Sequence, residues 1–302
     1  MTSINMTSIK LWRSLLSVPA INRRALEKSR TLAADAIIYD LEDAVAPGKK
    51  AEARENLERL YSEYRPGGVT AIRVNPLDTE DGSEDMKTVL ACQPDAVLLP
   101  KVGNVASIAT AGALLKRNGA PERIKLWAMI ETPEGVVNAA AIAGAFSDVR
   151  AGGRLEALVV GVNDLRADTG VAPSPGRAYL VPWLMQTVLA ARAYGIRVID
   201  GVYNDFADRE GYAAECAEGV AMGFDGKMLI HPNQIEAANR HFSPSEDAVA
   251  EARAIVEAFA NPGAEALNVI DLDGRMVERL HLEQAKALLA QVDAIQSTKD
   301  TR

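Results

Sequence analysis

Residues Leu15–Asn22 read LLSVPAIN, and this stretch decides between two α/β folds. It is a short apolar run of the kind that forms a buried strand, and a segment with helical spacing of apolar residues follows it. An open doubly wound sheet typically carries a glycine-rich phosphate turn after its first strand. Here the strand ends in Val18-Pro19-Ala20-Ile21-Asn22, with no GxGxxG and no P-loop. The stretch therefore favours a closed barrel.

Seven more apolar runs follow, each separated from the next by a helical pattern. All eight runs are continuously apolar, as expected of strands that are covered on both faces. The predicted strands begin at Leu15, Ala36, Thr70, Ala96, Lys125, Ala157, Arg197 and Asp225. Eight strand–helix units in about 225 residues fit an α/β fold of the (β/α)8 TIM-barrel type.

The pattern changes after Phe242. SPSEDAVAEARAIVEAFAN predicts an amphipathic helix, and a short extended piece, an Asp273-Gly274 turn and a last helix follow. A barrel closes without this segment. We therefore expect residues 1–242 to form a TIM-barrel catalytic domain, with residues 1–10 frayed. Residues 243–302 are expected to form a C-terminal helical extension that packs on the barrel or on a neighbouring subunit.

Composition excludes several classes of protein. The 302 residues are 48% hydrophobic and 25% charged, which is typical of a globular chain. The net charge of −8 argues against a nucleic-acid surface, and no apolar run approaches the roughly 18 residues that span a bilayer. Cys92 and Cys216 are isolated, with no CxxC motif, so they are expected to be core residues in a reducing compartment. Because no signal peptide is evident either, we predict a cytoplasmic protein.

In a TIM barrel the chemistry is located at the C-terminal ends of the strands. The polar residues predicted there are Asp40, Glu42, Asp43, Arg73, Asn75, Lys101, Glu131, Thr132, Asn163, Asp164, Tyr203, Asn204, Asp205 and His231. Of these, His231 precedes Pro232 at a strand-to-helix turn, where a structural hydrogen-bonding role is commoner than that of a base.

Glu131 and Asp164 end consecutive predicted strands, whose axes lie roughly 4.8 Å apart in a sheet. Two carboxylates at that separation repel each other unless a cation lies between them. An all-oxygen pair suits a hard divalent ion, Mg2+ or Mn2+, that keeps several waters. The alternative is structural, because the Glu131-Thr132-Pro133 junction can equally be a helix N-cap.

Arg73 ends an apolar strand, where a guanidinium is costly to bury without an anion. Either a substrate carboxylate or an internal ion pair with Asp40 or Glu42 accounts for it. Asp40-Leu41-Glu42-Asp43 supplies three carboxylates in four residues, and these cannot all ligate one small ion. Some of them must therefore bind Arg or Lys side chains.

Several motifs together resemble the citrate lyase beta-subunit-like proteins of the HpcH/HpaI aldolase and citrate lyase family. The resemblance runs in collinear order from about Arg13 to Asn233 and continues into the tail. Its segments are RSLLSVPAINRRALEKS, IIYDLEDAVAPGKKAEAR, AIRVN, LLPKV, MIETPEGV, GVNDLRADTG and GKMLIHPNQI. The combination of DLEDAV, RVN and IET is specific, whereas each alone is weak.

The resemblance implies a TIM barrel that cleaves or forms carbon–carbon bonds in short 3-hydroxyacyl-CoA thioesters, such as malyl-CoA, citramalyl-CoA or citryl-CoA. Coenzyme A is then part of the substrate, and a 2-oxo acid is the other product. By the same resemblance Glu131 and Asp164 ligate Mg2+, and Arg73 binds substrate and stabilises negative charge. We also predict Asp40 and Glu42 as catalytic residues, and we expect backbone N–H groups after Pro133 to help hold a substrate carboxylate at the helix N-terminus.

The resemblance also implies a homotrimer or hexamer in which the tail crosses between subunits. Relatives often carry G-[KR]-M-[IV]-D near the C-terminus, and that Asp acts as acid or base in a neighbouring subunit's site. Here Gly274-Arg275-Met276-Val277 is followed by Glu278, one methylene longer. The sequence thus predicts Glu278 as the proton-transfer group and leaves the effect of the longer side chain open.

Three other functions remain compatible with the sequence. A malyl-CoA thioesterase can use the same residues to let water attack the thioester. A beta component of a multisubunit citrate lyase would act on a thioester carried by an acyl-carrier protein. An aldolase for free 2-oxo acids is the third, and the tail after Phe242 argues against it.

Overall fold

The computed structural model describes residues 10–301, except 65, 67, 146–152, 174, 262, 264–266 and 273. The chain divides into two compact units, each of which is described by itself. One is Trp12–Phe242, and the other holds the described residues from Ser243 onward together with those before Trp12. Of the residues predicted to fray, 1–9 lie outside the described part.

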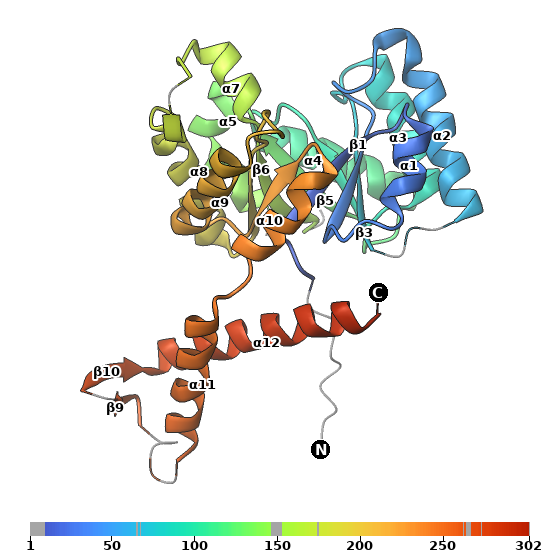
Figure 1. Ribbon diagram of the computed structural model, residues 1–302. Coiled ribbons are helices and arrows are strands. Elements are labelled where there is room, and N and C mark those ends of the chain that lie inside the picture. The colour runs from blue at the N-terminus through green and yellow to red at the C-terminus, as the bar shows by residue number, and fades with distance from the viewer. Residues whose placement is uncertain are drawn as a thin grey trace. The chain divides into compact units, whose positions relative to one another are not determined.

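Eight parallel strands close the first unit into a barrel in the order of the chain (Figure 1). They are β1 (Ser14–Pro19), β2 (Ala36–Asp40), β3 (Val69–Arg73), β4 (Ala96–Leu99), β5 (Lys125–Ile130), β6 (Leu155–Val160), β7 (Arg197–Asp200) and β8 (Gly226–Leu229). The last strand closes on the first through the pair Leu15↔Met228. The predicted (β/α)8 TIM barrel is confirmed.

The helices of this unit lie around the outside of the strands (Figure 1). They are α1 (Arg23–Ser29), α2 (Lys50–Glu63), α3 (Glu80–Cys92), α4 (Val105–Arg117), α5 (Pro133–Val137), α6 (Ala139–Gly144), α7 (Val162–Thr169), α8 (Val181–Tyr194), α9 (Arg209–Met222) and α10 (Ile235–His241), with 3-10 turns at Pro47–Lys49, Pro175–Arg177 and Pro232–Gln234. Several begin where a side-chain oxygen accepts an N–H of the first turn. These capping residues are Asn22, Thr79, Asn104, Thr132 and Asp208.

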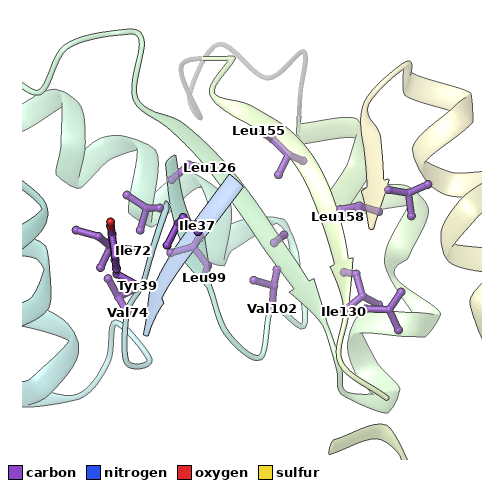
Figure 2. Packing of buried hydrophobic residues seen from close by; sticks show 14 of the residues in the cluster. Ile37, Tyr39, Ile72, Val74, Leu99, Val102, Leu126, Ile130, Leu155 and Leu158 are labelled. Carbon is purple, nitrogen blue, oxygen red and sulfur yellow. The ribbon is translucent and has the colours of Figure 1, made fainter. Parts of the chain in front are cut away.

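Alternation along each strand builds two apolar layers. On β2, Ala36 and Ile38 point into the barrel, whereas Ile37 and Tyr39 pack against the surrounding helices. Figure 2 shows part of the outer layer, with Tyr39 among its aliphatic neighbours. Cys92 and Cys216 are buried free thiols, as predicted.

A buried group of charges interrupts the outer layer near the end of β7. Lys227 is fully buried and donates to Asp200 and to Glu215, each at 2.8 Å. Arg177 binds the second oxygen of Asp200 at 2.6 Å. Each charge therefore has an opposite partner, which is the condition for burying it without a large loss of stability.

The second unit has its own apolar cluster. It contains α11 (Glu246–Ala260), the antiparallel pair β9 (Val269–Leu272) and β10 (Arg275–Glu278), and α12 (Arg279–Thr301). Ser245 caps α11, as the Ser-Pro-Ser start predicted, and Gly274 takes a positive φ of 76° in the β9–β10 turn. Asp273 of the predicted turn lies outside the described residues. Among the described helices, none combines the length and the hydropathy that a membrane crossing requires.

Candidate active site

The C-terminal ends of the barrel strands surround a cavity of about 350 Å³. Its charged and amide lining residues are Asp40, Asp43, Arg73, Glu131, Asn163, Asp164 and Asn204, and apolar side chains such as Met129, Val160, Val202 and Ile230 complete the wall. The cavity brings together half of the fourteen polar residues predicted from the sequence, and Glu42 and Lys101 are not among its lining residues. Pro133 is not among its lining residues.

The interior alternation of the barrel positions three of these side chains. Asp40 continues the inward series of β2, Arg73 continues that of β3 after Ala71, and Glu131 continues that of β5 after Met129. The polar groups thus form the last inward-facing layer, directly above an apolar barrel interior. Strand pairing places Asp40 opposite Arg73.

Arg73 forms internal ion pairs with Asp40 and Glu42. This is one of the two explanations that the sequence left open for a guanidinium at the end of an apolar strand. Its Nε donates to Asp40 Oδ1 at 2.8 Å and its Nη2 to Asp40 Oδ2 at 2.5 Å. Its Nη1 lies 3.0 Å from Glu42 Oε2. A two-point contact of this kind fixes the plane of the guanidinium. The same side chain lines the cavity, so the ion pair orients Arg73 without removing it from the site.

Glu42 is buried and contacts the Arg73 guanidinium. Burial raises the pKa of Glu42 to about 7, although the positive charge of Arg73 opposes the shift. Lys101 Nζ lies 3.5 Å from Glu42 Oε1 and gives the carboxyl a second cationic neighbour. A carboxyl with a pKa near neutrality is suited to exchange a proton during turnover.

A buried lysine holds the Asp40–Asp43 loop in place. Lys50 Nζ donates to Leu41 O, Glu42 O and Asn75 Oδ1 at 2.7–2.8 Å. Sequence reasoning missed this residue, although Lys50 falls on the buried face of α2 with Ala53, Leu57 and Leu60. That spacing was the available signal.

Asp40, which is paired with Arg73, is the most deeply buried acid that lines the cavity, and Glu131 is the next. It is 1% exposed, and its Oε1 accepts the backbone N–H of Lys101 at 2.7 Å. Its Oε2 is buried and has no hydrogen-bond partner among the described residues. Burial raises the pKa of Glu131 to about 8, the Lys101 hydrogen bond opposes this, and the negative charge of Asp164 adds to it.

Gly161 provides the space for Glu131. A Cβ built on Gly161 would lie 2.4 Å from both the Cβ and the Oε2 of Glu131. Any larger residue at this position must displace the carboxylate. Sequence reasoning missed this role of Gly161, and a glycine directly after a buried strand was the signal for a close approach.

The structure corrects the predicted position of Asp164. β6 ends at Val160, so Asp164 does not end a strand but lies in the first turn of α7. The backbone turns into the helix at Gly161, whose N–H still bonds to Ile130 O. Asp164 nevertheless lines the same cavity as Glu131.

The two carboxylates fit a divalent cation. Among the described residues no group of three or more His, Cys, Asp and Glu side chains is arranged to hold a metal, so at most two such side chains would bind a cation here. Mg2+ suits such a pair, because it keeps several waters and takes further oxygens from a substrate. The buried oxygen of Glu131 that lacks a donor is the atom such a cation would contact.

The Glu131-Thr132-Pro133 junction is a helix N-cap, but the capping residue is not Glu131. Thr132, not Glu131, is the N-cap of α5, and its Oγ1 accepts the Gly135 N–H at 3.0 Å. Val136 N–H is also occupied, by Thr132 O at 3.0 Å. Because the N–H groups of Gly135 and Val136 are occupied, the N–H of Glu134 is left for the predicted contact with a substrate carboxylate. This contact stays a prediction.

Glu278 and His231 lie in different units. Glu278 is an exposed residue at the end of β10, and its N–H donates to His281 Nδ1 at 2.9 Å. Its role at the barrel site stays a prediction.

His231 has the structural role that the sequence favoured, since its Nδ1 accepts the Asn233 N–H and caps the turn before α10.

The shifted pKa of Glu131 predicts how pH affects stability in metal-free protein. Between pH 5 and 8 the Glu131 carboxyl ionises in the unfolded chain but keeps its proton in the folded one. Its contribution to stability is therefore full below about pH 4.5 and is lost as pH rises towards about 8. We expect urea unfolding in EDTA to show that Glu131→Gln gains stability relative to wild type as pH rises. Parallel curves at pH 5.5 and 7.5 would contradict this.

Comparisons with known proteins agree on one family. The HpcH/HpaI aldolase/citrate lyase family matches residues 13–232. A (3S)-malyl-CoA thioesterase of Cereibacter sphaeroides is 43% identical over 285 residues, covering 94% of this chain and 95% of the relative. An L-malyl-CoA/beta-methylmalyl-CoA lyase of Rhodobacter capsulatus is 32% identical over 317 residues, covering 94% and 95%.

A solved structure also resembles this chain in sequence and in fold. The protein CitE from Mycobacterium tuberculosis, in complex with magnesium, acetoacetate and coenzyme A, is 30% identical with a TM-score of 0.73. The match covers 92% of this chain and 97% of that one. With the motifs, the barrel and the cavity, these matches establish that the chain belongs to the HpcH/HpaI aldolase/citrate lyase family.

Proposed function

We propose that this chain is a Mg2+-dependent carbon–carbon lyase. Its substrate is a short 3-hydroxyacyl-CoA with a further carboxylate, of the malyl-CoA, citramalyl-CoA or citryl-CoA type. The products are a 2-oxo acid and an acyl-CoA. The observation that carries the proposal is the buried Glu131 oxygen without a donor, in a cavity that Asp164 and Arg73 also line.

Glu131 and Asp164 are the proposed ligands of the cation. Bound there, Mg2+ or Mn2+ would supply Lewis-acid stabilisation of negative charge on substrate oxygens. Gly161 keeps the space that the Glu131 carboxylate needs, and Lys101 N–H holds one of its oxygens. The Glu131 carboxylate is therefore oriented before a cation binds, which keeps the cost of reorganisation low.

Arg73 is the proposed electrostatic and substrate-binding residue. Asp40 holds its guanidinium plane through two hydrogen bonds, so the positive charge is fixed at the cavity wall. That charge stabilises the negative charge that develops as the carbon–carbon bond breaks. Asp40 acts through Arg73 and is therefore a positioning residue.

Glu42 is the proposed acceptor of the substrate hydroxyl proton, because its pKa of about 7 lies near neutrality and, although it does not itself line the cavity, it contacts Arg73, which does. When the hydroxyl loses its proton, the carbon–oxygen bond becomes a carbonyl and the carbon–carbon bond breaks. The bonding electrons leave on the acyl-CoA as its enolate. The enolate then needs a proton, and Glu278 is the proposed donor.

Thioester hydrolysis is the second candidate, and the 43% identity to a (3S)-malyl-CoA thioesterase favours it. In that reaction water attacks the thioester carbonyl, and free CoA and a hydroxy acid leave. The lyase reading has its own support in the malyl-CoA lyase relative. The two reactions differ in whether a 2-oxo acid forms, and product analysis tests that difference.

The tail is proposed to act between subunits of a homotrimer or hexamer in the cytoplasm. Val269, Met276 and Leu280 are apolar and 45–68% exposed on the second unit. These are the apolar side chains that a neighbouring subunit would cover in the proposed assembly. Such a contact would deliver Glu278 to a neighbouring barrel.

Glu278→Gln tests this assignment. Turnover is expected to fall about 10²-fold with little change in substrate KM, because a proton donor acts in the transition state and not in binding. Glu283→Gln is the matched control, since Glu283 is an exposed acid of α12 paired with Lys286. Wild-type kinetics in the Glu278 variant would remove this residue from the mechanism.

A further inference from the structure

Lys101 has a backbone conformation that its residue type rarely adopts. Its φ is +50°, and among the described residues only Gln93 and Arg177 are other non-glycines with a positive φ. The left-handed region is unfavourable for a residue with a Cβ. Such conformations persist where the surroundings determine them strongly, and they cluster at functional sites.

Hydrogen bonds made by the three residues after Lys101 hold its backbone in this conformation. Val102 N–H donates to Met129 O at 3.2 Å, and Asn138 Nδ2 donates to Gly103 O at 2.8 Å. Asn104 Nδ2 binds Glu134 Oε1 at 3.2 Å. Three successive residues that follow Lys101 thus join the segment after β4 to β5 and to the segment after β5.

The left-handed turn has one direct consequence for the cavity. It directs the Lys101 N–H to Glu131 Oε1, with a nitrogen–oxygen distance of 2.7 Å. One oxygen of the carboxylate is thereby occupied, and Oε2 is left without a donor. Gly161 leaves room for that second oxygen on its other side.

We propose that Lys101 is a positioning residue whose left-handed backbone fixes the rotamer of Glu131 and so leaves Glu131 Oε2 for a divalent cation. This inference rests on the proposed cation site. It assigns the effect to the main chain of Lys101 and not to its ammonium group. The residue type at this position is then limited by its tolerance of a positive φ.

Three variants without the ammonium group isolate the backbone effect. Lys101→Gly adopts a positive φ freely, Lys101→Ala carries the ordinary penalty of a Cβ, and Lys101→Val carries the larger penalty of a β-branched side chain. We expect the glycine and alanine variants to bind Mg2+ within about threefold of each other, and the valine variant about tenfold more weakly. The measurement is calorimetric titration of substrate-free protein with Mg2+.

The outcomes separate the two proposals. Equal Mg2+ affinity in all three variants would overturn the role of the Lys101 backbone while leaving the cation site intact. No Mg2+ binding by wild type, or unchanged binding by Glu131→Gln, would overturn the cation site itself and the inference with it. If the valine variant does not fold, a glycine variant that binds Mg2+ at least about tenfold more weakly than wild type contradicts the inference, because glycine keeps the N–H.

Discussion

Replacing Glu131 with Gln is expected to abolish Mg2+ binding and to lower turnover about 10³-fold or more. The amide has nearly the shape of the carboxyl, and its oxygen can still accept the Lys101 N–H. It lacks the negative charge that a cation requires. Asp164→Asn is expected to have the same effect. Folding is expected to survive, because the variant loses no hydrogen bond that Glu131 accepts among the described residues.

Matched controls exist for both variants. Glu122→Gln changes an exposed acid in the turn before β5, and Asp168→Asn changes an exposed acid one turn after Asp164 in α7. Both controls should keep Mg2+ binding and turnover. Wild-type activity in Glu131→Gln, measured with Mg2+ after removal of other metals, would contradict the site.

Gly161→Ala is expected to have the second largest effect. The new Cβ would lie 2.4 Å from Glu131 Oε2, so the carboxylate must move. We expect turnover to fall at least about 10²-fold, because a ligand displaced by even an ångström no longer matches the reacting geometry. The protein should also lose about 1–3 kcal/mol of stability from overpacking.

Gly48→Ala is the control for this change. No atom lies within 4 Å of a Cβ at Gly48, and its φ is not in the left-handed region. Calorimetric titration with Mg2+ and steady-state rates should separate the two alanine variants. A Gly161→Ala protein with unchanged Mg2+ affinity and turnover would show that Glu131 does not need its observed position.

The alternation of side chains made part of the site predictable. Inward residues on β2, β3 and β5 are apolar until Asp40, Arg73 and Glu131, so the last inward position of each strand stands out in the sequence. The barrel itself follows from eight apolar runs and helical spacing between them. Asp164 was identified as a site residue, but as the end of a strand instead of the start of a helix.

Other parts of the site depend on contacts whose partners no local pattern gives, although helical spacing places Lys50 on the buried face of α2. Lys50 holds the loop after β2 through backbone carbonyls, and Lys101 holds Glu131 through its own N–H. Backbone partners are identical for every residue type, so the letters of the sequence do not reveal them. The position of Gly161 directly after a buried strand indicates a close approach, but only the structure identifies the Glu131 side chain as its partner.

The most direct test of the proposed function is product analysis with malyl-CoA and Mg2+. The 2-oxo acid, the acyl-CoA and free CoA are to be quantified separately, with an EDTA-treated sample beside them. The lyase proposal predicts equal amounts of glyoxylate and acetyl-CoA, little free CoA, and no turnover in EDTA until Mg2+ is restored. Free CoA without glyoxylate would contradict the lyase proposal and establish the thioesterase, and full activity in EDTA would contradict the metal site.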